Sequence, residues 1–148
     1  GVLFLFLAFY QVSRPYQQEI NLRGPILVGC FLAGLVIHGK LQGWWIGPIL
    51  GQLAPLPLML ISALFTSFND NALITYLSTY IPNITPALQK AVVSGGIGGG
   101  GLTIIANAPN PAGASLLKKA FPEGIAPLDL FLAAAFPTAV ILVLSAIF

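Results

Sequence analysis

The sequence has 148 residues, of which 57% are hydrophobic and only 7% are charged, and its formal net charge is +2. Soluble domains carry about 25% charged residues, so this chain cannot cover itself with charge in water, and we expect its outer surface to face lipid. The small, scattered positive charge excludes a nucleic-acid-binding surface, and a single cysteine excludes a disulfide framework.

Residues 1–53 are expected to form scaffold helices. The chain opens at Gly1 inside a hydrophobic run, so we interpret it as a piece of a longer protein. A helix needs about 20 apolar residues to cross a bilayer. Residues 1–12 have the composition of the end of such a helix, a polar connection follows over 14–23, and residues 24–39 form a second apolar segment.

A turn is expected over residues 40–43. Trp44 and Trp45 follow it, and aromatic side chains of this kind favour the membrane–water interface. Residues 46–53 then predict a short helix.

Residues 54–81 contain two apolar arms, 55–67 and 71–81, separated by a short polar sequence. At 1.5 Å per residue the arms measure about 20 and 16 Å, so neither spans a bilayer alone. We therefore predict a re-entrant hairpin with its tip at Ser67–Asn71. The alternative is one helix of about 27 residues with a polar kink near its middle.

Residues 86–119 predict a discontinuous helix. Its first half should dissolve at the glycine-rich residues 95–101, and Pro109 and Pro111 cannot both lie inside a regular helix. The second half is expected to start with Asn110 as N-cap and Pro111 at the first helical position.

Residues 126–148 are expected to form the final transmembrane helix, with Pro137 as a kink. Basic residues favour the cytoplasmic side of a membrane, which places the C-terminus outside. This orientation rests on four basic residues on one side against two on the other: Arg14, Arg23, Lys118 and Lys119 against Lys40 and Lys90. The sequence therefore predicts an all-α membrane protein, a single membrane domain over residues 1–148.

Asp70 is the only acidic residue that the predicted elements place far from a membrane interface. A carboxylate at that depth is costly and indicates function. Ser67, Asn69 and Asn71 add neutral oxygens of the kind that hard cations prefer, so we predict a Na⁺ site at Asp70 and Asn69. The alternative role for Asp70 is to cap the arm that starts at Asn71, and the two roles are compatible.

The break in the discontinuous helix supplies a second candidate site. Glycines let backbone groups approach an ion, and the half-helix beginning at Pro111 would point its positive dipole end inward. The alternative is that the glycines serve only helix packing. The predicted ion-binding side chains are Thr103, Asn107 and Asn110, with backbone approach at Gly98, Gly99, Gly100 and Gly101.

Two stretches carry a family resemblance: the tip Ser67-Phe68-Asn69-Asp70-Asn71, and Gly98–Gly101 followed by ANAPNPAG over 106–113. Over about residues 20–148 the chain resembles the ion transporter superfamily, which includes arsenite permeases, sodium/proton antiporters and dicarboxylate carriers. On ANAPNPAG it is most similar to a sodium/proton antiporter branch. The resemblance implies two inverted repeats, each with a hairpin and a discontinuous helix. This chain would be the C-terminal one, and the N-terminal repeat or another chain would supply the other hairpin.

The leading hypothesis is Na⁺/H⁺ antiport in which Asp70 binds Na⁺ and H⁺ in turn, within an inner or plasma membrane. The alternatives are a sodium-coupled carrier of an organic anion or oxyanion, and a membrane subunit without transport activity. We expect no enzyme activity and no cofactor besides the ions. The expected partners are lipid, the other repeat and a second copy in a homodimer.

Overall fold

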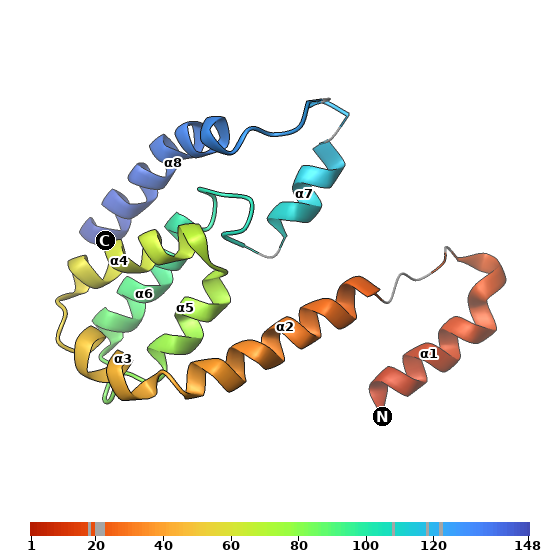
Figure 1. Ribbon diagram of the computed structural model, residues 1–148, viewed down its shortest axis with the longest axis horizontal. Coiled ribbons are helices and arrows are strands. Elements are labelled where there is room, and N and C mark those ends of the chain that lie inside the picture. Colours follow the sequence, from red (N-terminus) through yellow and green to blue (C-terminus); the bar gives the residue numbers. More distant parts are fainter. Residues whose placement is uncertain (18, 20–22, 108, 118, 122) are drawn as a thin grey trace. The chain divides into compact units, whose positions relative to one another are not determined.

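The computed structural model describes residues 1–17, 19, 23–107, 109–117, 119–121 and 123–148, and every regular element within these ranges is a helix (Figure 1). Lys118, used in the orientation prediction, and Ala108, within the ANAPNPAG stretch, lie outside the described residues. The contacts divide the chain into two units, Gly1–Gly34 and Leu35–Phe148, and the boundary falls inside helix α2.

The first unit contains α1 (Val2–Ser13), the short 3-10 helix η1 (Arg14–Tyr16) and the start of α2 (Arg23–Lys40). Helix α1 ends at Ser13 and continues directly into η1, whose second residue is Pro15; Arg14 between them keeps a helical conformation, with φ of -46° and ψ of -39°. The exposed Arg14–Glu19 ion pair, at 3.8 Å, stabilises little in water. The predicted apolar helix is present as α1, and the polar connection predicted over 14–23 is described at residues 14–17, 19 and 23.

Helix α3 (Gly43–Leu50) follows α2 after the predicted turn, and the helix axes over Pro25–Lys40 and Gly43–Leu50 are bent by 73°. It begins three residues earlier and ends three residues earlier than the predicted 46–53. Gly47 lies against the segment after α5, where a Cβ atom would come within 3.0 Å of the Tyr80 carbonyl oxygen. A glycine is therefore needed at this close contact.

The two predicted hairpin arms are the separate helices α4 (Pro55–Phe68) and α5 (Asn71–Ser78). Asn69 and Asp70 between them are extended, with ψ of 165° and 139°. This confirms the break at the polar tip and rules out one continuous helix with a kink. Both arms pack against α6, and the path of the pair through a membrane remains a prediction (Figure 1).

Helix α6 (Pro86–Gly99) is capped by Thr85, whose hydroxyl accepts a hydrogen bond from the Leu88 amide at 3.4 Å. The prediction that this helix dissolves at Gly95 was wrong, because it continues to Gly99. A Cβ atom on Gly95 or Gly99 would overlap the α4 backbone. The close packing of α4 offsets the helix-forming cost of about 1 kcal/mol that each glycine carries.

Helices α7 (Asn110–Leu117) and α8 (Pro127–Ile147) complete the chain. The break between α6 and α7 therefore lies between Gly99 and Asn110, and Asn110 is the first helical residue instead of the cap. Among the described helices, α8 alone is long and apolar enough to cross a membrane, and the bent α2–α3 pair makes a second crossing if it is one span.

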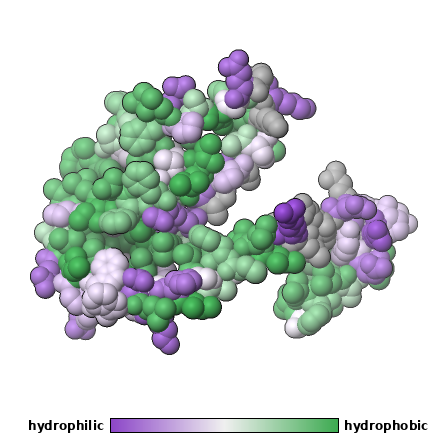
Figure 2. All heavy atoms as spheres, in the orientation of Figure 1, coloured by the Kyte–Doolittle hydropathy of each residue, from purple (hydrophilic) through white to green (hydrophobic). Residues whose placement is uncertain are grey.

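The core of the larger unit lies between α4 and α6, around Leu58, Met59, Ala91 and Val92. Large apolar side chains elsewhere are exposed, and hydrophobic residues cover much of the face in view in Figure 2. On α8, Thr138 is the only buried residue that the structure describes. Such a surface suits lipid or another protein chain better than water.

Candidate ion-binding site

Asp70 lies at the hairpin tip and caps helix α5. One of its carboxylate oxygens, Oδ1, accepts a hydrogen bond from the Ala72 amide at 2.7 Å, and the residue is half-buried. The capping role considered from the sequence is therefore present. A carboxylate has two oxygens and about four acceptor positions, so one cap bond leaves capacity for a cation.

The other tip residues are held by their own helix. The Ser67 hydroxyl donates to the Ala63 carbonyl oxygen at 2.9 Å, and the Asn69 side-chain amide donates to the Phe65 carbonyl oxygen at 3.4 Å. Asn71 begins α5 and lies near Gly96 of α6, where a Cβ atom would be 3.8 Å from the Asn71 Cβ. These two bonds tie the tip side chains to the last turns of α4, and Asn71 is the tip residue that lies near α6.

Asn110 holds the break between α6 and α7 together. Its side-chain amide nitrogen donates to the Gly100 carbonyl oxygen at 2.8 Å and to the Thr103 carbonyl oxygen at 2.9 Å. Its backbone amide donates to the Asn107 carbonyl oxygen at 3.0 Å. One asparagine thus joins the end of the first half-helix to the start of the second.

Thr103 connects this break to the hairpin tip. Its hydroxyl donates to the Ser67 carbonyl oxygen at 2.6 Å, across 36 residues of sequence. The two clusters predicted separately from the sequence therefore meet at this hydrogen bond.

The predicted glycines have different surroundings. A Cβ atom on Gly99 would overlap Ala63 of α4, one on Gly98 would lie 2.8 Å from Leu142 of α8, and one on Gly100 would lie 3.1 Å from the Gly96 carbonyl oxygen. A Cβ atom on Gly101 would meet nothing within 4 Å. Packing against the α4 backbone accounts for Gly99, whereas the group nearest to Gly98 is the flexible end of the Leu142 side chain. The approach of these glycines to an ion remains a prediction.

Two threonines at the site were not predicted. The buried Thr138 hydroxyl donates to the Gly98 carbonyl oxygen at 3.0 Å and so ties α8 to the end of α6. The Thr66 hydroxyl is fully buried and has no hydrogen-bond partner among the described residues. Thr66 adjoins the predicted tip, but otherwise neither residue stands out in the sequence. Whether a threonine hydroxyl has a hydrogen-bond partner on another helix depends on the tertiary structure.

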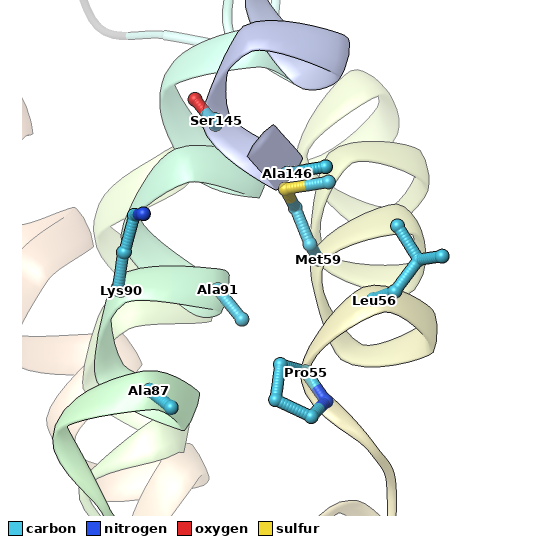
Figure 3. Close-up of a pocket in the computed structure, with 8 residues that line it drawn as sticks. All are labelled: Pro55, Leu56, Met59, Ala87, Lys90, Ala91, Ser145 and Ala146. Carbon is cyan, nitrogen blue, oxygen red and sulfur yellow. The ribbon is translucent and has the colours of Figure 1, made fainter. Parts of the chain in front are cut away.

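Two cavities flank α6. One, of about 260 Å³, is lined by residues of α4, α6 and the end of α8, including Lys90 and Ser145 (Figure 3). It contains none of the predicted site residues, and its lysine would repel a cation. The other, of about 490 Å³, is lined in part by Asn71, Thr75, Thr79 and Gly96, and it adjoins the tip.

Within the described ranges, no three His, Cys, Asp or Glu side chains come together as a metal cage. The site instead offers one carboxylate, hydroxyl and amide groups, and backbone carbonyls at a broken helix. Oxygen groups of this kind suit a hard monovalent cation.

The family model described as "Putative Na+/H+ antiporter" matches residues 1–148. No curated protein and no solved structure matches the chain.

Proposed function

The chain belongs to this family of Na⁺/H⁺ antiporters, and from that membership we infer that it exchanges Na⁺ for H⁺ across a membrane with Asp70 as the shared binding group. Membership makes it a membrane protein and a cation antiporter at the level of the family. The choice of ions, the role of Asp70 and the side to which the C-terminus points are our proposals.

The observation that carries this proposal is the hydrogen bond from Thr103 to the Ser67 carbonyl oxygen. It joins the tip to the break, and in our proposal the cation binds at Asp70, three residues after Ser67. In transporters built from broken helices, the freed backbone carbonyls and the half-helix ends bind the ions. We propose that the backbone between Gly99 and Asn110 provides such carbonyls here.

Competition at one carboxylate is enough to couple the two ion fluxes. Na⁺ and H⁺ cannot occupy Asp70 together, because protonation removes the charge that attracts the cation. If the protein changes the side to which the site opens only when Asp70 is occupied, each Na⁺ moved one way is matched by protons moved the other way. We therefore expect the apparent KM for Na⁺ to rise as pH falls.

The test is Asp70→Asn in membrane vesicles that contain the complete protein, with Na⁺-dependent proton movement as the readout. Asparagine keeps an oxygen that can cap α5, so the protein should fold and insert while exchange is lost. Asp70→Glu should keep weak exchange with a shifted pH profile, because the charge moves by one methylene. Asp129→Asn, in the first turn of α8, is the matched control.

Each competing role predicts a different result. If Asp70 only caps α5, the Asn variant should exchange ions almost as well as the unmutated protein. If the substrate is an organic anion or oxyanion, Na⁺ should move no protons even without a mutation. Either result would contradict the proposal.

A further inference from the structure

Thr66 is the one buried side chain among the described residues whose hydroxyl has no hydrogen-bond partner, and its relative exposure is 0%. Other hydroxyl side chains of α4 and α5 donate a hydrogen bond to a backbone carbonyl of their own helix: Ser67 to Ala63, Thr75 to Asn71 and Ser78 to Thr75. A buried hydroxyl without a partner is costly. Its presence one residue before the tip therefore needs an explanation.

Gly96 is the group that faces this hydroxyl from α6. A Cβ atom at Gly96 would lie 4.0 Å from the Thr66 oxygen and 3.8 Å from the Asn71 Cβ, which are ordinary contact distances. The backbone of α4 excludes a side chain at Gly95 and Gly99, but packing does not exclude one at Gly96. The glycine thus leaves room beside the Thr66 hydroxyl that an alanine methyl group would occupy.

The cavity of about 490 Å³ reaches this place, because Asn71 and Gly96 both line it. Its lining is largely apolar, and the hydroxyls of Thr75 and Thr79, which also line it, donate to backbone carbonyls. The Thr66 oxygen itself is closed to solvent in this conformation. A guest would therefore reach it only when α5 and α6 move slightly apart at Gly96.

We propose that the Thr66 hydroxyl is an oxygen ligand of the transported Na⁺, which enters from the cavity beside Gly96 while the hairpin tip closes around it. The proposal rests on the antiport function proposed above and adds a ligand on α4 to the carboxylate of Asp70. Its physical basis is that Na⁺ requires several oxygen ligands, and a hydroxyl without a protein partner has both of its lone pairs free.

The test compares Thr66→Val with Thr66→Ser in the complete purified protein and in vesicles. Valine has nearly the same shape and removes the unpaired hydroxyl, so without Na⁺ this variant should unfold at the same temperature as the unmutated protein or at a higher one. It should lose most of the stabilisation that added Na⁺ gives, and its apparent KM for Na⁺ should rise by about tenfold or more. Serine keeps the hydroxyl and should preserve both quantities.

Gly96→Ala provides a second, independent variant. The methyl group fits without a clash, so the fold should persist, but it fills the room beside Thr66 and should also weaken Na⁺ binding. Gly34→Ala in α2 is the matched control, because a Cβ atom there meets nothing within 4 Å.

The proposal would be overturned if Thr66→Val kept both the Na⁺-dependent rise in unfolding temperature and the apparent KM for Na⁺ of the unmutated protein. It would also be overturned if the variant unfolded at a lower temperature without Na⁺, because the hydroxyl would then have a structural role. Different results would contradict the proposed antiport. If Asp70→Asn lost exchange and Thr66→Val had no effect, only the role of Thr66 as a ligand would be contradicted. If Na⁺ raised the unfolding temperature in a Thr66-dependent way but the protein moved no protons, only the antiport would be contradicted.

Discussion

The Thr103 hydroxyl donates a 2.6 Å hydrogen bond to the backbone carbonyl oxygen of Ser67. Ser67 lies in the last turn of α4, and Thr103 lies in the break after α6. A side chain of one broken segment thus holds the backbone of the other. Any movement of the hairpin tip relative to the break must stretch or replace this bond.

Thr103→Val should therefore weaken the junction. The variant loses one hydrogen bond, which contributes about 0.5–1.5 kcal/mol net, and it leaves the Ser67 carbonyl without that donor. We expect a lower unfolding temperature in detergent and slower exchange, with Thr103→Ser close to the unmutated protein. Equal unfolding temperatures for the Val and Ser variants would show that the bond adds no stability.

Gly99 and Gly101 should respond differently to substitution. Gly99→Ala should destabilise the protein by 2 kcal/mol or more, roughly the cost of overpacking a helix contact, because the methyl group meets the Ala63 backbone. Gly101→Ala should fold normally and slow exchange if the backbone approaches the ion there. The measurements are the yield of folded protein and exchange in vesicles, with Gly34→Ala as the control.

A Gly99→Ala variant of normal stability would contradict the packing role of Gly99. Normal exchange in a well-folded Gly101→Ala variant would remove Gly101 from the list of ion contacts. A larger substitution such as Gly99→Leu could not separate the two roles, because its side chain would also clash with Ala63.

The predicted topology places Lys119 in the cytoplasm and Asn83 outside. Asn83 has a φ of 51°, which most residues adopt only with strain, so a cysteine is better placed at the exposed Pro86, the first residue of α6. In a Cys30→Ser background, cysteines at positions 86 and 119 should react with an impermeant reagent from opposite sides. Labelling of both positions from the same side would mean that the predicted path of the hairpin or of the broken helix through the membrane is wrong.

The sequence predicted where the chain breaks better than how its helices pack. The polar tip at Asn69 and Asp70 and the start of α7 near Asn110 follow from local rules, because Asp, Asn and Pro favour helix ends. The end of α6 was placed too early. Glycine disfavours a helix when it is considered alone, whereas at Gly95 and Gly99 it is the residue that lets α4 come close.

The threonine roles could not be predicted for a related reason. A threonine in a helix usually bonds to its own backbone, as Thr75 does. Whether Thr103 reaches Ser67, Thr138 reaches Gly98, or Thr66 reaches nothing depends on the neighbouring helix. No pattern of spacing in the chain encodes that difference.

The attachment of α8 has a consequence for the lipid that surrounds the protein. Its 21 residues make a rod of about 31 Å, close to the thickness of a bilayer's hydrocarbon core. Thr138 bonds it to Gly98 near its middle, one residue after Pro137. A thinner bilayer would tilt the rod about that point, and the tilt would pull on the last turn of α6. We therefore expect the exchange rate to depend on acyl-chain length, and Thr138→Val to reduce that dependence.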